Sequence, residues 1–175
     1  MTQPTVIVLA SGRGERFTAS GGGNHKLQAL LAGKPVLQHT LDAVRASGLP
    51  WHLEDAGHPG MGDSIAAAVY ATWPSPGWLV LPGDLPLIRS DTLHAIALAL
   101  RAHDVVVPLY HRQRGHPVGF HARCGEALLR LKGPRGAAAV VLAHGAFELA
   151  VQDAGCVTDI DTVDDLRAAG LLIHP

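Results

Sequence analysis

Short apolar runs alternate along the chain with stretches in which apolar residues recur at helical spacing. Residues 5–10 are rich in β-branched residues and apolar on both faces, which is typical of a buried central strand. Residues 36–47 carry an apolar helical face and end at Gly48, as helices commonly do. The pattern predicts further strands over residues 78–81, 104–108, 148–151 and 156–159, and further helices over 63–71, 91–102, 125–131, 135–143 and from Thr162 onward. This alternation favours an α/β fold with a mostly parallel sheet flanked by helices.

Two segments depart from this simple pattern. Residues 51–60 are rich in His, Gly and Pro and are predicted to be irregular. Residues 116–120 are predicted to form an edge strand, because proline is tolerated at the edge of a sheet. The chain contains no repeat and no linker-like stretch, so we expect a single domain over residues 1–175.

Composition and charge narrow the class of protein. Lys and Arg number 14 and Asp and Glu number 15, so no basic excess favours nucleic-acid binding. No apolar run is long enough for a membrane span, and the first residues lack the basic start of a signal peptide. Cys124 and Cys156 form no CxxC pair. These features together predict a cytoplasmic enzyme with free thiols, with neither a membrane nor a nucleic acid among its partners.

A glycine-containing loop follows the first strand directly. In open parallel sheets, ligands bind outside the carboxyl ends of the strands. Gly12 and Gly14 allow the backbone to approach a phosphate, and Arg16 and Lys26 can neutralise its charge. The loop lacks the Gly-Lys-Ser/Thr of a Walker A motif, and Phe17 replaces the third glycine of a dinucleotide fingerprint. A flexible turn with solvated arginines is the alternative interpretation.

Aspartates follow the strand at 78–81 and precede the last helix. Asp84 lies between two prolines and is well placed to bind Mg²⁺ that bridges phosphates, although a turn aspartate explains it too. Asp159 and Asp161 could supply a second metal ligand. Asp164 and Asp165 are explained by the favourable position of acids in the first turn of a helix.

Other polar residues lie at the starts of helices or in a basic loop. Ser64 is positioned to contact a ribose or phosphate, but a plain helix start accounts for it equally well. Arg135 precedes a helix and could reach an anion. The loop with Arg112, Arg114 and His116 fits either a solvated turn or an arm for an anionic substrate.

Taken together and in order, these segments resemble the molybdenum cofactor nucleotidyltransferases, and most closely their cytidylyltransferase branch. The resemblance covers nearly the whole chain and implies a Rossmann-like nucleotidyltransferase fold, in which one strand–helix unit before residue 60 is shortened. The motifs that carry it are LASGRGERF (9–17), HKL (25–27), GKPVL (33–37), GMGDSI (60–65), GDLP (83–86), GHPVGF (115–120), GPRGA (133–137) and DIDT (159–162).

The resemblance implies transfer of CMP from CTP to the phosphate of molybdopterin, with release of pyrophosphate and with Mg²⁺ as cofactor. It also implies a role for individual residues. Arg16 and Lys26 would hold the triphosphate, and Asp84 would hold Mg²⁺ with Asp159 or Asp161. The expected nucleotide-binding set is Leu9, Ala10, Ser11, Gly12, Gly14, Arg16, Lys26, Ser64 and Asp84, and the expected acceptor-binding residues are His116 and Arg135.

Three alternatives remain open at this point. The side chain of Ser11 stands where guanylyl-transferring relatives typically have glycine, which favours CTP, but a GTP-dependent guanylyltransferase of the same family is the nearest alternative. An NAD(P)-linked oxidoreductase on the same scaffold is less consistent with the missing GxGxxG motif. The shortened unit would also fit a noncatalytic protein that delivers the cofactor to a molybdoenzyme.

Overall fold

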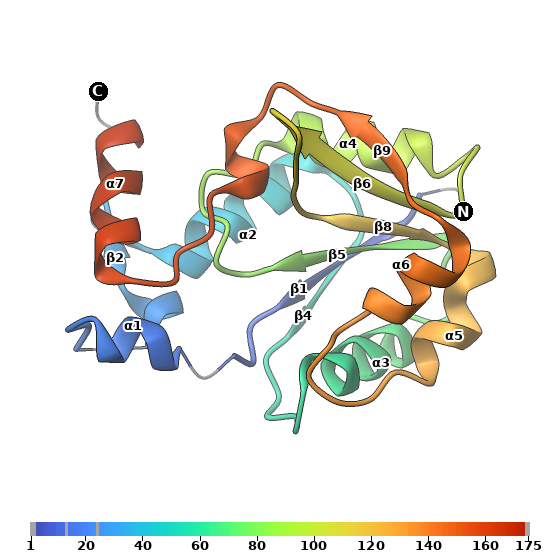
Figure 1. Cartoon of the computed structure of the whole chain (residues 1–175), viewed down its shortest axis with the longest axis horizontal. Coiled ribbons are helices and arrows are strands. Elements are labelled where there is room, and N and C mark those ends of the chain that lie inside the picture. Colours follow the sequence, from blue (N-terminus) through green and yellow to red (C-terminus); the bar gives the residue numbers. More distant parts are fainter. Residues whose placement is uncertain (1–2, 13, 24, 174–175) are drawn as a thin grey trace.

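Seven strands form one mixed sheet in the part of the chain that the computed structural model describes, residues 3–12, 14–23 and 25–173 (Figure 1). Arg13 of the glycine-containing loop lies outside this part, as do Met1 and Thr2. The strands are β1 (Thr5–Leu9), β4 (Trp51–Glu54), β5 (Gly77–Pro82), β6 (Val105–Tyr110), β7 (Gln113–Arg114), β8 (Val118–His121) and β9 (Phe147–Ala150). Their spatial order is β4-β1-β5-β8-β6-β7, with β9 parallel to β6. Only β7 and β8 run opposite to the other strands, so the predicted mostly parallel α/β sheet is confirmed.

Helices cover both faces of this sheet. The α-helices are α1 (Glu15–Ala19), α2 (Val36–Ser47), α3 (Met61–Ala71), α4 (Ser90–Ala99), α5 (Gly125–Leu129), α6 (Ala138–His144) and α7 (Val163–Ile173). Short 3-10 helices are η1 (Lys26–Gln28), η2 (Ala122–Cys124) and η3 (Ala154–Val157), and β2 (Leu30–Leu31) pairs with β3 (Lys34–Pro35) in a separate ribbon. None of the helices in the described residues is both long enough and apolar enough to cross a membrane.

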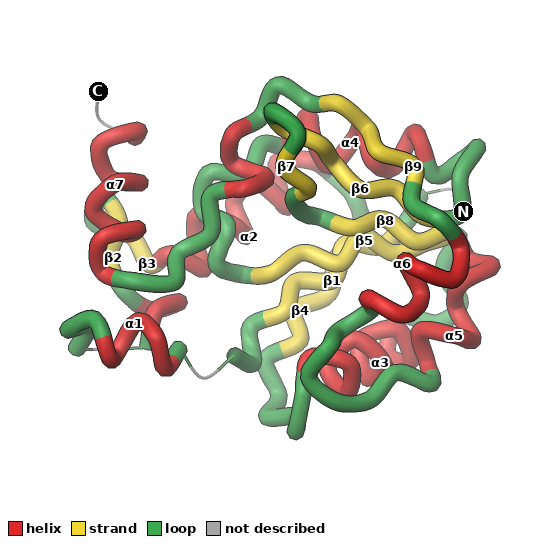
Figure 2. The backbone as a smooth tube through the Cα atoms, in the orientation of Figure 1, coloured by secondary structure: helices red, strands yellow, loops and turns green. Residues whose placement is uncertain are grey.

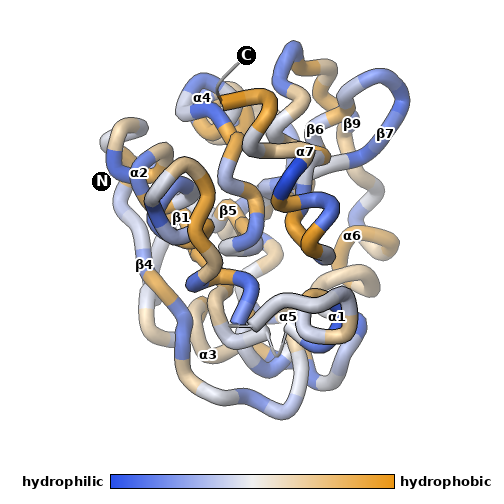
Figure 3. The backbone as a smooth tube through the Cα atoms, turned by 90° about the vertical axis from the view of Figure 1, so that its left-hand side faces the viewer, coloured by the Kyte–Doolittle hydropathy of each residue, from blue (hydrophilic) through white to orange (hydrophobic). Residues whose placement is uncertain are grey.

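The first strand, β1, has apolar residues on both of its faces because helices cover both sides of the sheet. Val6 and Val8 pack on the face covered by α2 and α4, whereas Ile7 packs on the face covered by α3 and α5. All three side chains are fully buried. Because successive residues of a strand point to opposite faces, a strand covered on both sides requires apolar residues throughout. The turn around β7, by contrast, is hydrophilic (Figure 3).

The segment 51–60 was predicted to be irregular, and this prediction is wrong at its start. Residues 51–54 form β4, which pairs in parallel with β1 in the register Val6↔Trp51 to Leu9↔Glu54. At this end of the sheet the strand is held by its ladder to β1 alone, so its composition does not need to be apolar. β4 is the one regular element between α2 and α3, consistent with the shortened strand–helix unit.

Two other strand predictions are also corrected. The strand predicted at the edge, residues 116–120, lies inside the sheet as β8, between β5 and β6. Pro117 immediately precedes β8, so its missing N–H removes no ladder hydrogen bond. Residues 156–159 form no strand, because the first two of them belong to η3. The carboxylate of Asp153 accepts a hydrogen bond from the Gly155 N–H at 2.8 Å and fixes that turn.

The parallel register places two loops next to each other. Leu9 at the end of β1 lies opposite Pro82 at the end of β5, and the Gly83 N–H donates to the Leu9 carbonyl at 2.9 Å. The loops that follow these strands therefore leave the sheet at the same edge (Figure 2). A smaller apolar cluster, which includes Phe17, Leu27 and Ile160, packs α1, η1 and α7 beside this edge.

We expect core burial to dominate the stability of the sheet, and α4 offers a matched test. Ile96 is 0% exposed and Leu98 is 63% exposed on the same helix. Ile96→Ala should lower the free energy of unfolding by about 2–5 kcal/mol, because it leaves a cavity in the core. Leu98→Ala should change it by less than about 0.5 kcal/mol. Urea unfolding at constant m-value measures both, and equal losses would contradict the packing described here.

Candidate active site

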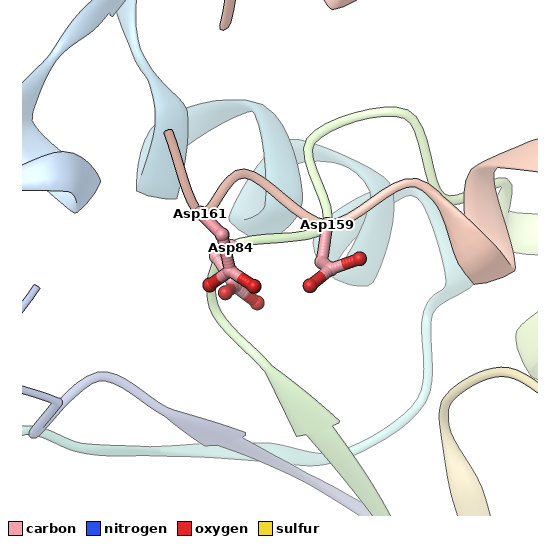
Figure 4. Close-up of side chains that lie close together, drawn as sticks. All are labelled: Asp84, Asp159 and Asp161. Atoms are coloured by element: carbon pink, nitrogen blue, oxygen red, sulfur yellow. The ribbon is translucent and has the colours of Figure 1, made fainter. Parts of the chain in front are cut away.

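Three carboxylates converge where the loop after β5 meets the segment before α7. The Ile160 N–H donates to the carbonyl of Asp84 at 3.0 Å, and this bond joins the two segments. Asp84, Asp159 and Asp161 each bring a carboxylate oxygen within 4.8 Å of the other two. Figure 4 shows these side chains directed to one common side of the backbone. The arrangement gathers three negative charges into a small space.

Lys26 lies against two of these carboxylates. Its Nζ donates to Oδ2 of Asp84 at 2.7 Å and to Oδ1 of Asp161 at 3.1 Å. Arg16 adds an ion pair with Asp161 at 3.2 Å. Lys26 and Asp84 are mostly buried, whereas the Arg16 side chain is largely exposed. The structure thus brings together all five residues predicted for the phosphate and metal site, Arg16, Lys26, Asp84, Asp159 and Asp161.

The charges in this cluster shift the pKa values of its members. Burial raises the pKa of the Asp159 carboxyl, and the neighbouring Asp161 and Asp84 raise it further. Burial opposes ionisation of Asp161 as well, but contacts with Lys26 outweigh it and lower the pKa of Asp161. Burial would lower the pKa of Lys26, yet its ion pairs with Asp84 and Asp161 raise it above the ordinary value. The cluster therefore favours a cation in its midst.

A cavity of about 300 Å³ lies on one side of the acids. The hydroxyls of Ser11 and Ser64 lie 2.9 Å apart in its wall. It is lined by Leu9, Ser11, Gly12, Lys26, Leu27, His58, Pro59, Gly60, Met61, Ser64, Pro82, Gly83 and Asp84. Gly14 and Arg16 line an adjoining cleft that also reaches Lys26 and Asp161. Most of the predicted nucleotide-binding residues therefore share one continuous surface.

The loop between β1 and α1 is fixed by contacts that the sequence does not reveal. The Ala10 N–H donates to the carbonyl of Glu54 at 2.9 Å, so Ala10 anchors the loop rather than lining the cavity. Gly14 has φ +66°, a left-handed conformation that disfavours other residues. The His25 Nε2 hydrogen-bonds the carbonyl of Gly12, while Nδ1 accepts from the Leu27 N–H at 3.2 Å. His25 thereby ties the loop to η1, which carries Lys26.

A second cleft lies on the other side of the acids. His116 lines this cleft together with Arg114, Met61 and the three aspartates. Desolvation lowers the pKa of His116, and the charge of Asp84 opposes this shift only in part. The cleft continues through Arg114, Gly115 and His116 into an apolar cavity of about 510 Å³ between β6, β8 and α6.

Arg135 does not join these cavities. It lies in an exposed turn before α6 and is absent from the residues that line the clefts described above. Its loop instead braces the start of α3, since the Gly62 N–H donates to the Gly133 carbonyl at 2.8 Å. The carboxylate of Asp63 in turn accepts from the Gly133 N–H at 3.0 Å.

His58 and Met61 line the cavity of about 300 Å³, although neither was among the predicted site residues. Met61 also lines the second cleft and so separates the two. Met61 lies within the GMGDSI motif and His58 lies just before it, and this position was the available signal. The irregular composition of residues 51–60 hid their placement.

The mostly parallel mixed sheet flanked by helices matches the fold of solved nucleotidyltransferase structures. Residues 41–147 match the model of the MobA-like NTP transferase domain, and the chain belongs to this family. The matched segment includes Ser64, Asp84 and His116. Lys26 and Asp161 lie outside the matched segment. In the tertiary structure Lys26 contacts both Asp161 and Asp84, which lies inside it.

Solved structures and curated proteins agree with this family. Rv0371c from Mycobacterium tuberculosis H37Rv is 27% identical, with a TM-score of 0.81 over 96% of this chain and 97% of that one. Its complex with manganese is 26% identical and superposes with a TM-score of 0.77 over 96% of this chain and 98% of that one.

Among curated proteins, the bifunctional protein GlmU of Nitrosomonas europaea is 31% identical over 69% of this chain and 30% of its own length. The 2-C-methyl-D-erythritol 4-phosphate cytidylyltransferase of Frankia casuarinae is 34% identical over 60% of this chain and 35% of its own length. The chain thus spans about a third of the length of the curated relatives it matches.

The lowered pKa of Asp161 predicts a pH dependence of stability. Its ionised form stabilises the fold above the ordinary value of 3.8, and this contribution is lost as the pH falls through the lowered value. In chelator, the stability difference between wild type and Asp161→Asn should therefore shrink as the pH falls below about 4.

Urea unfolding between neutral pH and pH 3 measures this difference. The control is Asp164→Asn, whose side chain is 91% exposed and pairs with Arg167 at 3.4 Å. Such surface pairs contribute little, so this variant should follow wild type. A constant difference for Asp161→Asn over the same range would contradict the described ion pairs.

Proposed function

We propose that this chain transfers CMP from CTP to the phosphate of molybdopterin and releases pyrophosphate, with Mg²⁺ as its cofactor. One observation carries the proposal. The acidic cluster and Lys26 lie between two clefts, one lined by the loop after β1 and the other reaching an apolar cavity. Two substrates that bind on either side of the cluster would meet at it. The ordered motifs of the molybdenum cofactor nucleotidyltransferases support the identity of both substrates.

The donor set fits a divalent metal ion. Asp84, Asp159 and Asp161 offer carboxylate oxygens, which are the ligands that Mg²⁺ prefers. Burial and, after it, the neighbouring acids raise the pKa of Asp159, and a divalent cation would relieve the repulsion between the carboxylates. When bound there, Mg²⁺ would neutralise phosphate charge and orient the triphosphate. The manganese complex of Rv0371c supports a divalent metal in this family.

The proposed reaction requires no nucleophile from the protein. An oxygen of the acceptor phosphate would form a bond to the α-phosphorus of CTP. The bond from that phosphorus to the oxygen bridging to the β-phosphorus would break, and pyrophosphate would leave with the electron pair. Lys26 and Arg16 would hold phosphate oxygens by their charge, and the two clefts would align the reactants. Positioning and electrostatic stabilisation supply most of the catalysis in such phosphoryl and nucleotidyl transfers.

The shape of each cleft supports the choice of substrates. The Ser11 side chain, joined to Ser64, narrows the cavity that would receive the base, which favours a pyrimidine over a purine. The resemblance to a cytidylyltransferase from Frankia casuarinae is in line with CTP. The cavity beyond His116 is lined by Val107, Val118, Val141 and Leu142, which suits the flat body of a pterin.

Asp84→Ala should reduce pyrophosphate release from CTP in the presence of molybdopterin and Mg²⁺ by at least about 100-fold, because charge stabilisation at the reacting phosphates is lost. The same variant should bind Mn²⁺ more weakly in calorimetry, while its far-ultraviolet circular dichroism stays unchanged. Asp91→Ala, an exposed acid on α4, is the control. Undiminished turnover by Asp84→Ala would contradict the proposed role of Asp84 in binding the metal ion.

A thermal-shift panel with CTP, GTP, ATP and NADPH, each with and without Mg²⁺, tests the nucleotide. A ligand at 100 times its dissociation constant adds about 2.7 kcal/mol to the stability of the folded state. We expect the largest shift with CTP and Mg²⁺. A larger shift with GTP would reassign the chain to guanylyl transfer, and a response to NADPH alone would overturn the proposal.

A further inference from the structure

Three polar side chains from β4 and the loop after it, Glu54, His52 and His58, lie close together beside the cavity of about 300 Å³ that would receive the nucleotide. Oε1 of Glu54 lies 3.6 Å from Nε2 of His58 and 3.9 Å from Nε2 of His52. Both Nε2 atoms are closed off from solvent and have no hydrogen-bond partner. The Glu54 side chain is itself only 11% exposed. Two imidazole nitrogens therefore point at one buried carboxylate.

The two histidine Nε2 atoms lie near the Glu54 carboxylate but form no hydrogen bond with it. Distances of 3.6 and 3.9 Å exceed the range of an N–H···O bond. Among the described residues, the ion-pair partners of Glu54 are these two histidines. A buried acceptor beside buried, unpaired ring nitrogens is an arrangement that native proteins rarely leave without a purpose. The Glu54 carboxylate oxygen lies closer to Nε2 of His58 than to Nε2 of His52.

The group is joined directly to the proposed nucleotide site. The backbone carbonyl of Glu54 accepts from the Ala10 N–H at 2.9 Å, next to Ser11. His58 lines the cavity together with Ser11 and Gly12 of the loop after β1, whereas His52 does not line it. The His58 side chain is 21% exposed although its Nε2 is closed off, so its exposed part lies elsewhere than at that nitrogen.

We infer that His58 selects the base of the nucleotide and that Glu54 is its positioning residue; this rests on the proposed function. The carboxylate of Glu54 holds the proton on Nε2, which leaves Nδ1 as a hydrogen-bond acceptor toward the cavity. An acceptor at this point fits the exocyclic amino group of cytosine. Uracil presents a carbonyl oxygen in that place, and two acceptors facing each other would reject it.

The test compares binding of CTP·Mg²⁺ and UTP·Mg²⁺ by calorimetry, and both nucleotides share the same ribose and triphosphate. We expect wild type to prefer CTP by at least about 100-fold, since sites built to bond a polar group discriminate strongly against an analogue without it. His58→Phe should reduce this preference to less than about tenfold, through weaker binding of CTP. Glu54→Gln should reduce it in the same direction, because it no longer fixes the proton on Nε2.

His52→Phe is the matched control, since His52 contacts the same carboxylate oxygen but does not line the cavity. It should leave the ratio within about twofold of wild type. A general packing defect would weaken both nucleotides alike and leave the ratio unchanged.

An unchanged CTP-to-UTP ratio in His58→Phe overturns the inference, as does a wild type that binds the two nucleotides equally. The proposed function fails separately if wild type prefers CTP in binding but releases no pyrophosphate with molybdopterin. In that case the loss of preference in His58→Phe would still support His58 as the base-selecting residue. Failure to bind either nucleotide would overturn both.

Discussion

The ammonium group of Lys26 joins three segments that are far apart in the chain. Asp84 follows β5, Asp161 precedes α7, and Lys26 itself starts η1 after the loop from β1. Because these contacts are mostly buried, removal of one partner would leave the charge of the others uncompensated. The backbone bond from Ile160 to Asp84 holds two of these segments at a fixed spacing. The two clefts, the acids and the loop after β1 are all arranged around this point.

The sheet makes this meeting possible. β1 and β5 are parallel neighbours, so their carboxyl ends lie at the same edge and deliver Leu9 and Asp84 to one place. β4 adds Glu54 and His58 from the opposite side of β1, and the loop before α6 braces the start of α3. The result is a groove with the acidic cluster near its middle. A reaction between two phosphate groups needs this kind of placement more than it needs a reactive side chain.

Much of the fold could be predicted from the sequence, because local patterns record burial. The all-apolar run of β1, the helical face ending at Gly48 and the strand before Asp84 were each read from residue type alone. The predictions failed where pairing or side-chain capping decides the structure. β4 has no apolar pattern, since one ladder holds it, and η3 follows from a hydrogen bond of Asp153. Pro117 pointed to an edge, although β8 lies within the sheet.

By itself the sequence determined the class of the fold, the family resemblance and the acids and bases that could act on phosphates. Those properties depend on residue type and on spacing over a few residues. Only the tertiary structure decided that Lys26 contacts Asp84 and Asp161, that Arg135 does not line the clefts, and that His58 lines the cavity beside the acidic cluster. These facts depend on contacts between residues up to 135 positions apart, and such contacts leave no mark in a local pattern. They arise when the strands pair and the charged residues of their loops are brought together.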